Sequence, residues 1–87
     1  MGGTCFILRM EWEAIVGANI RRLRKAKGLT QEQLAHEAEI AMRYIAGVER
    51  GEENPSLRYL VKIAEALEAE PADLLRRDLE TATRRRC

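Results

Sequence analysis

The chain has 87 residues, of which 33% are charged and 46% are hydrophobic, and its formal net charge is +1. This composition fits one small soluble domain and is too apolar for a disordered tail. The longest uninterrupted apolar run, Cys5 to Leu8, is far too short to cross a bilayer, so we expect no membrane segment. One histidine and two cysteines at opposite ends nearly exclude a metal site or a Cys/His catalytic pair.

The near-zero net charge is the sum of opposed blocks along the chain. Residues 21–27 carry five positive charges and no negative one. Residues 28–55 and residues 65–80 each carry two positive and six negative charges, and Arg84 to Arg86 add three positive ones. Such blocks are usually solvated faces, and they favour nucleic-acid binding only where the fold gathers the positive ones.

A first helix is predicted upstream of Gly28. Val16, Ile20, Leu23 and Lys27 recur at i, i+4, i+7 and i+11, which places them on one helical face. Gly28 then stands where a helix commonly ends in a left-handed glycine.

A second, short helix is predicted to follow. Residues 30–33 fit a capping box, in which the Thr30 side chain bonds the Gln33 backbone and the Gln33 side chain returns to the Thr30 backbone. The helix is expected to be about two turns long, because residues 40 and 41 break its register. Its narrow apolar face is Leu34, Ala35 and Ala38.

Three further amphipathic helices are predicted. The third runs from about Met42 to Arg50 and stops at Gly51, the fourth begins near Ser56, and Pro71 opens the fifth. No segment alternates with a period of two, so the pattern predicts an all-α fold of five short helices. The expected inward positions are Ile45 and Val48, then Leu57, Leu60, Ile63, Ala64 and Leu67, and then Leu74, Leu75 and Leu79.

Only three residues, Glu39-Ile40-Ala41, separate the second predicted helix from the third. Two short helices joined so tightly meet at a steep angle, which is the geometry of a helix-turn-helix. The spacing alone is a weak signal, because many helical bundles contain short turns.

Specific residues around this turn strengthen the interpretation. They are Gly28-Leu29-Thr30-Gln31-Glu32-Gln33-Leu34-Ala35, Ile40, Tyr44-Ile45, Val48-Glu49-Arg50-Gly51 and Asn54-Pro55-Ser56-Leu57. Over about residues 16–75 the sequence therefore resembles the Cro and phage-repressor-like family, also called the xenobiotic-response-element family. The resemblance implies a five-helix, lambda-repressor-like DNA-binding domain, and it extends to small stand-alone regulators such as restriction–modification controller proteins.

The resemblance makes the third predicted helix the recognition helix, with its N-terminal end in the major groove. The family's base-reading positions fall on Ala41, Met42, Arg43 and Ala46, with Gly47 beside them. Arg43 alone can make paired hydrogen bonds to guanine O6 and N7, whereas the alanines and the methionine offer apolar contacts, for example to a thymine methyl group.

The resemblance also implies backbone contacts and one structural ion pair. The family uses a glutamine at the start of the second helix, here Gln31, on a phosphate, and free amides at a helix N-terminus suit an anion. Arg24 and Glu49 match a pair that the family buries between the first helix and the end of the recognition helix. The further phosphate-contact positions are Arg50, Gly51 through its amide, Asn54, Ser56 and Arg58.

Four residues depart from the family pattern. The turn position usually held by glycine is Glu39, which must adopt a positive φ at a cost or reshape the turn. Ala41 stands where a hydroxyl usually caps the recognition helix. Glu52 and Glu53 lie where the family often has basic residues, and their carboxylates are expected to lower the affinity for DNA.

One such module reads about four to five base pairs, so useful specificity is expected to need a homodimer on a pseudo-palindromic operator. The family generally pairs through its C-terminal helices. Core packing is expected to claim at least half of the apolar candidates, which are Leu67, Leu74, Leu75 and Leu79.

The domain organisation is expected to be an N-terminal extension at 1–13, the DNA-binding domain at 14–80 with its motif at about 31–50, and a basic tail at 81–87. No sensor domain follows, so we expect a stand-alone regulator controlled by its own concentration. The extension is interpreted either as the product of an upstream start, with Met10 as the natural initiator, or as an apolar segment that packs on a partner subunit.

The sequence therefore predicts a cytoplasmic, homodimeric transcription regulator of the repressor or controller type that binds double-stranded DNA. Two alternatives stay open: an antitoxin that pairs with a toxin protein, and a protein-interaction adaptor, which the acid-rich residues 28–55 favour. No phosphate loop, paired-acid motif or metal spacing appears, so we expect no enzyme activity, cofactor, metal ion or small-molecule ligand. His36 is expected at the surface, and Cys5 and Cys87 are expected as free thiols.

Overall fold

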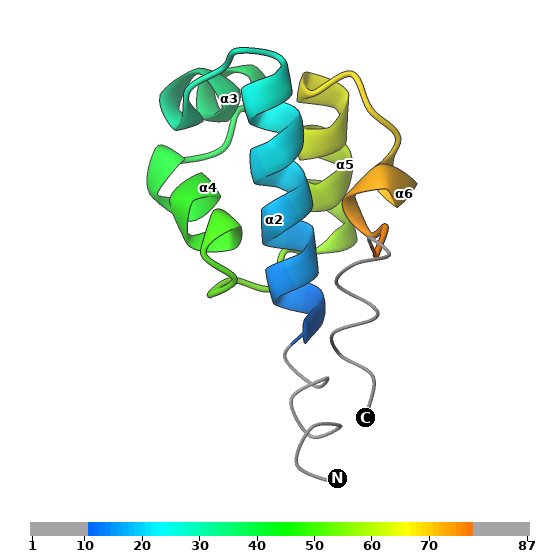
Figure 1. The fold of residues 1–87 in the computed structure, drawn as a ribbon. Helices are drawn as coiled ribbons and strands as arrows, with labels where there is room; N and C mark the ends of the chain where they lie inside the picture. Colours follow the sequence, from blue (N-terminus) through cyan, green and yellow to red (C-terminus); the bar gives the residue numbers. More distant parts are fainter. Residues whose placement is uncertain (1–10, 78–87) are drawn as a thin grey trace, which may run out of the picture.

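The computed structural model describes residues 11–77, and these residues form five α-helices and no strand. In the view of Figure 1, the first helix runs through the middle, with the next two on one side and the last two on the other. The predicted all-α class with five helices is confirmed for this part of the chain. The helices are α2 (Glu11–Ala26), α3 (Gln31–Ala38), α4 (Met42–Glu49), α5 (Leu57–Ala66) and α6 (Pro71–Leu74).

The local signals in the sequence set most of the helix ends. Thr30 and Gln33 form the predicted capping box: the Thr30 hydroxyl accepts from the Gln33 amide at 3.0 Å, and Gln33 Oε1 accepts from the Thr30 amide at 2.8 Å. Ser56 caps α5 in the same way, because its hydroxyl accepts from the Tyr59 amide at 3.3 Å. Gly28, with φ of +75°, follows the end of α2.

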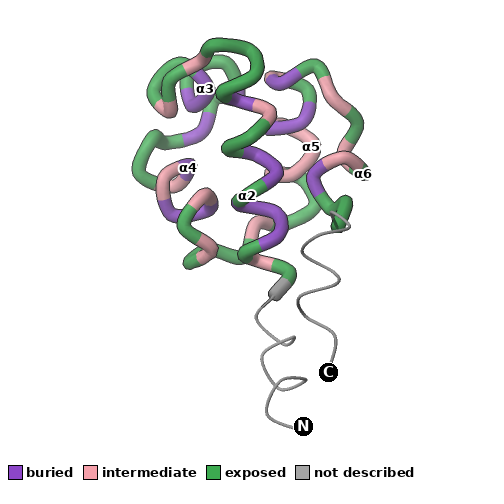
Figure 2. Tube along the Cα trace, viewed as in Figure 1, coloured by how far each residue is buried: buried purple, intermediate pink, exposed green. Residues whose placement is uncertain are grey.

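One aliphatic core lies among the helices, and each of them contributes at least one buried position (Figure 2). The apolar face predicted for α3 is buried, as are the two inward residues predicted for α4. All five helices supply at least one of the largest fully buried side chains, which are Ile20, Leu34, Ile45, Val48, Ile63 and Leu74.

Two predicted core positions are wrong. Leu57 is 73% exposed because it is the first residue of α5, and the buried side of that helix begins one turn later. Leu75 is 44% exposed because α6 is a single turn that ends at Leu74, whereas a longer fifth helix was expected. The remaining predicted residue of that helix, Leu79, lies outside the described residues.

Asn19 of α2 explains why the chain leaves the helical path after Leu74. Its side-chain amide is buried and donates to the carbonyl oxygens of Leu74 at 2.9 Å and Arg76 at 2.8 Å. Its own oxygen accepts from the Arg22 guanidinium at 2.9 Å. The carbonyls at the end of α6 are therefore held by a side chain of α2, so a further helical turn is not needed to satisfy them.

The N-terminal extension expected over residues 1–13 overlaps α2, which already begins at Glu11. Trp12 belongs to this helix, and its ring packs against the Arg77 guanidinium, whose carbon lies 4.8 Å from the ring centroid. Other expectations concern residues outside the described range, namely those on Cys5, Met10, Cys87, the Phe6-Ile7-Leu8 segment and the Arg84-Arg85-Arg86 tail.

The turn between α3 and α4 keeps a glycine-like backbone although it holds a glutamate. Glu39 has φ of +59°, in the left-handed region, and its amide donates to the His36 carbonyl at 3.2 Å. The Ile40 amide then donates to the Ala35 carbonyl at 3.0 Å, which closes the end of α3. The turn is thus not reshaped. Glu39 adopts a left-handed backbone conformation, which is unfavourable for residues that carry a Cβ atom.

Replacing Glu39 by glycine is expected to raise the free energy of unfolding by about 1 kcal/mol, because glycine adopts a positive φ without steric cost. Urea or thermal unfolding measures this change. Glu68, with φ of +58°, offers a matched comparison, but its carboxylate accepts from Lys27 Nζ at 2.8 Å. Glu68→Gly should gain less because it also loses this ion pair, and a destabilised Glu39→Gly variant would contradict the argument.

Candidate nucleic-acid interface

The tight turn brings α3 and α4 against each other, and α4 also packs against α2. The buried side chain of Ile40 fixes the turn to the core. The inner side of α4, formed by Ile45 and Val48, is buried in the core. The opposite side of α4 is therefore held at the molecular surface by contacts with two other helices.

The exposed side of α4 carries most of the predicted base-reading residues. Ala41, Met42 and Arg43 are exposed, and Ala46 is partly exposed. Met42 and Arg43 lie four and three residues before Ala46, so the three occupy neighbouring positions on one helical face. Ala41 is the N-cap and makes no side-chain capping bond, as the missing hydroxyl implied.

Gly47, which the resemblance placed beside the base-reading residues, differs from this group. It is buried, and a Cβ atom at Gly47 would lie 2.8 Å from Glu53 Cγ. The loop after α4 thus folds back and lays the Glu53 side chain across the helix. The sequence predicted only that Glu53 lies in an acidic loop with Glu52, and it did not predict the contact with Gly47.

The residues expected to contact phosphates are placed in different ways. Arg50 is exposed, but its Nη2 donates to Glu52 Oε1 at 3.0 Å. This hydrogen bond and the arginine charge hold the pKa of Glu52 below its ordinary value, and the same carboxylate raises the pKa of Arg50. Asn54 and Arg58 are exposed, and Ser56 is exposed while its hydroxyl caps α5.

The amide of Gly51, one of the expected phosphate contacts, is already bonded within the protein. It donates to the Val48 carbonyl at 3.0 Å, and Gly51 has φ of +79°. The amide therefore closes the end of α4 and is already satisfied inside the protein, so it does not present a free donor to a phosphate.

Arg24 and Glu49 form the ion pair that the resemblance implied. Arg24 Nε donates to Glu49 Oε2 at 2.6 Å and Arg24 Nη2 donates to Oε1 at 3.0 Å, while Nη1 reaches the Leu29 carbonyl at 2.8 Å. Their side chains are only 10% and 3% exposed. The hydrogen bond with Glu49 raises the pKa of Arg24 further above its already high value.

Gln31 joins this ion pair, which the sequence reasoning missed. Its Nε2 donates to Glu49 Oε1 at 3.0 Å. The start of α3 is thereby tied to the end of α4, and one amide hydrogen of Gln31 is already engaged. The free backbone amides at the start of α3 then carry more of any phosphate contact made there.

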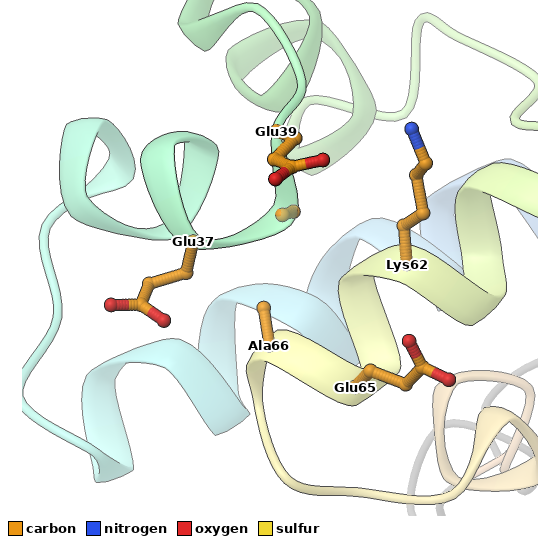
Figure 3. A pocket seen from close by; sticks show the side chains of 6 residues that line it. Glu37, Glu39, Lys62, Glu65 and Ala66 are labelled. Atoms are coloured by element: carbon orange, nitrogen blue, oxygen red, sulfur yellow. The ribbon is translucent and has the colours of Figure 1, made fainter.

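An acidic hollow of about 360 Å³ lies between α3 and α5 (Figure 3). Glu37 and Glu39 border it from the α3 side, and Lys62 and Glu65 from α5. Three carboxylates against one ammonium group disfavour a phosphate here, so the side of α3 that faces α5 is a poor DNA surface.

Residues 11–77 contain neither a cluster of metal-ligating side chains nor a membrane-spanning helix. No three histidine, cysteine, aspartate or glutamate side chains in this range gather as a metal ion would require. No helix in the same range is both long and apolar enough to cross a membrane.

Comparisons with known proteins agree with the geometry. Residues 20–74 match the helix-turn-helix family HTH_3. Control protein C.BamHI of Bacillus amyloliquefaciens is 40% identical over 62 residues, covering 70% of this chain and 76% of that protein. Control protein C.SmaI of Serratia marcescens is 38% identical over 73 residues, covering 84% and 83%. The crystal structure of the restriction-modification controller protein C.AhdI from Aeromonas hydrophila superposes with a TM-score of 0.70 at 45% identity, covering 71% of this chain and 94% of that one.

Proposed function

This chain belongs to the helix-turn-helix family of transcriptional regulators of the controller and repressor type, and we propose that it binds a pseudo-palindromic operator as a cytoplasmic homodimer. In this proposal α4 enters the major groove. The observation that carries it is the exposed N-terminal side of α4, which the α3–α4 turn and the packing on α2 hold at the surface.

The base contacts are assigned to the exposed positions of α4. The Arg43 guanidinium reaches a guanine through O6 and N7, the arrangement that only arginine and lysine side chains commonly make. Ala41, Met42 and Ala46 supply apolar contacts, for which a thymine methyl group is the natural partner. Gly47 is left out of this set because it is buried.

The phosphate contacts are assigned around α4. Asn54 and Arg58 are exposed on the loop and on the first turn of α5, and Ser56 lies between them. Arg50 donates one of its five N–H groups to Glu52, whose charge weakens a phosphate contact there. Gln31 contributes beside the amides at the start of α3. The acidic loop opposes these contacts, so affinity depends on the dimer and on a correct site more than on bulk charge.

Two of the four leucines expected at the dimer contact are not available for it. Leu67 and Leu74 belong to the core, with 4% and 0% exposure, so neither can meet a second subunit. Leu75 is 44% exposed and lines a shallow hollow with Trp12, which is 45% exposed. A twofold pair joined near these residues has to place its two copies of α4 roughly 34–36 Å apart to read successive major grooves.

Arg43→Ala and Arg58→Ala test the assigned roles as a pair. Selection from a pool of random duplexes with the intact chain supplies the operator, and fluorescence titration at two salt concentrations measures binding. Arg43→Ala is expected to lose about 1–3 kcal/mol of discrimination at one guanine. Arg58→Ala is expected to weaken all sequences equally and to reduce the salt slope by about one.

The wild-type chain provides the decisive control for this experiment. If it binds no duplex at low salt, both the regulator and the antitoxin interpretations fail. If Arg43→Ala keeps full discrimination, the chain binds DNA in some way other than through α4. Analytical ultracentrifugation of the chain with and without operator tests the homodimer separately.

The acidic hollow between α3 and α5 favours the adaptor as a second candidate, because three carboxylates there suit a basic protein segment. An adaptor would bind such a partner and no duplex. An antitoxin would share every DNA contact described above and differ by pairing with a toxin, so the neighbouring gene distinguishes it from a stand-alone regulator.

A further inference from the structure

The loop after α4 places a negative charge on the helix proposed to read DNA. The Glu53 side chain lies across Gly47, where a Cβ atom would come within 2.8 Å of Glu53 Cγ and 3.4 Å of Glu53 Oε2. Gly47 follows Arg43 by four residues, which puts the two positions one above the other on the helix. Glu53 thus occupies the space that a side chain at position 47 would fill.

A second observation places the charge of Glu53 close to α4. Burial raises the pKa of the Tyr44 phenol, and the nearby carboxylate of Glu53 raises that pKa further. Glu53 is exposed, and within residues 11–77 it forms no ion pair or hydrogen bond. No direct bond in this part of the chain holds the Glu53 carboxylate, although the pKa of Arg50 is raised by the nearer Glu52 and also by the charge of Glu53.

The neighbouring Glu52 behaves differently. Its carboxylate accepts from the Arg50 guanidinium at 3.0 Å, and both side chains are more than half exposed. Glu52 is thus bonded to an arginine that we expect at a phosphate, whereas the Glu53 side chain lies on α4.

We propose that Glu53, seated on Gly47, is a specificity-determining residue of the DNA-reading surface. This inference rests on the proposed function. A carboxylate without a partner repels backbone phosphates, so it weakens every complex in which α4 approaches DNA without matching base contacts. At a matching site the same carboxylate accepts a hydrogen bond from a cytosine amino group, which offsets the repulsion. Glu53 therefore lowers non-specific affinity more than operator affinity.

Glu53→Gln tests this role because it removes the charge and keeps the size of the side chain. Affinity for random duplex should rise about three- to tenfold, the size expected for one like-charge repulsion at a hydrated surface. Operator affinity should change less, so the ratio of operator affinity to random-duplex affinity falls. In newly selected sites, the preference for cytosine at one position should weaken. An unchanged ratio with an unchanged selected site overturns the inference.

Glu52→Gln is the matched control, because it removes the same charge from the same loop without touching α4. It frees Arg50 for a phosphate, so both affinities should rise by the same factor and the salt slope should increase by about one. If Glu52→Gln lowers the ratio of operator to random-duplex affinity as much as Glu53→Gln does, loop charge alone sets discrimination. The position of Glu53 on Gly47 would then not matter, and the inference is overturned.

Gly47→Ala tests the seat itself and leaves both glutamates in place. The new methyl group displaces only the flexible Glu53 side chain, and alanine is a better helix former than glycine. The variant should therefore melt at a higher temperature than the wild type and yet discriminate less well. A variant that melts higher with full discrimination contradicts the role of the seat.

The Tyr44 titration checks the geometry without DNA. Glu53→Gln removes a nearby negative charge, so the phenol should ionise at lower pH than in the wild type, whereas Glu52→Gln should leave it unchanged. Ultraviolet absorbance of the Tyr44 phenolate, with Tyr44→Phe as the blank, measures this. An unmoved titration in Glu53→Gln overturns the placement of the carboxylate. If the wild type selects no duplex while the titration moves, the proposed function fails and the geometry stands.

Discussion

Replacing Arg24 by alanine is expected to lower the free energy of unfolding by about 3–5 kcal/mol, because it leaves a buried carboxylate without its cation. The Glu49 side chain is only 3% exposed, and two of its hydrogen bonds come from Arg24. After the substitution only the Gln31 amide still donates to it. The Leu29 carbonyl loses its arginine donor as well.

The expected loss is large for a chain of this size. Small domains are stable by about 5–15 kcal/mol, so the variant approaches the point at which it unfolds at ordinary temperature. Each kcal/mol corresponds to about 4–8 °C in the melting temperature of a domain this small. Thermal unfolding followed by circular dichroism is therefore sensitive enough to measure the effect.

Lys27→Ala is the matched control on the same side of the fold. It removes the ion pair with Glu68, in which Lys27 Nζ lies 2.8 Å from Glu68 Oε1. The Lys27 and Glu68 side chains are 33% and 78% exposed. Because solvent screens an exposed pair, the loss should be a small fraction of that in Arg24→Ala.

A double variant separates the unpaired charge from the lost pair. Arg24→Met combined with Glu49→Leu replaces the buried ions by apolar side chains, and such replacements are often neutral or stabilising. The double variant should therefore be more stable than Arg24→Ala alone. If it is equally unstable, the ion pair contributes through its own bonds, and the explanation by an unpaired carboxylate is wrong.

The ion pair also fixes the position of α4, the helix proposed to contact DNA. Arg24 belongs to α2, Glu49 ends α4 and Gln31 begins α3, so one cluster of hydrogen bonds joins the three helices. In the proposed complex, a phosphate at the start of α3 lies next to a residue that fixes the end of α4. Loss of the pair should therefore reduce operator affinity even at temperatures at which the variant stays folded.

The parts of the fold that the sequence predicted are those that short-range chemistry decides. The capping box of Thr30 and Gln33 lies within four residues, and the φ of +75° at Gly28 follows from the end of a single helix. The three-residue turn before α4 follows from two helical patterns that nearly meet. Each of these features depends on neighbours in the sequence, so a pattern can indicate it.

The parts that the sequence missed depend on contacts between distant segments. Asn19 gave no signal because its partners, the carbonyls of Leu74 and Arg76, lie 55 and 57 residues away. The seat of Glu53 on Gly47 depends on how the loop returns to the helix. Short apolar periods also could not separate Leu74 in the core from Leu75 at the surface, because α6 is only one turn long.

Gly17 also has a role that depends on a contact between distant segments. Gly17→Ala is expected to lower the free energy of unfolding by about 3 kcal/mol. Gly17 is buried in α2, where it allows the backbone of α4 to approach. A Cβ atom at this position would lie 2.8 Å from the Glu49 carbonyl oxygen and would overlap the carbonyl oxygen of Val48. Backbone atoms cannot move aside as a side chain does, so α2 and α4 would have to separate and open the core.

Gly47→Ala makes the same substitution at a second buried helical glycine and should have the opposite sign. Its new methyl group meets only the movable Glu53 side chain, so the gain in helix propensity of up to about 1 kcal/mol is largely kept. Urea unfolding of the two variants beside the wild type gives both values. If Gly17→Ala were as stable as Gly47→Ala, the close approach of α2 and α4 would not be what fixes α4 on the domain.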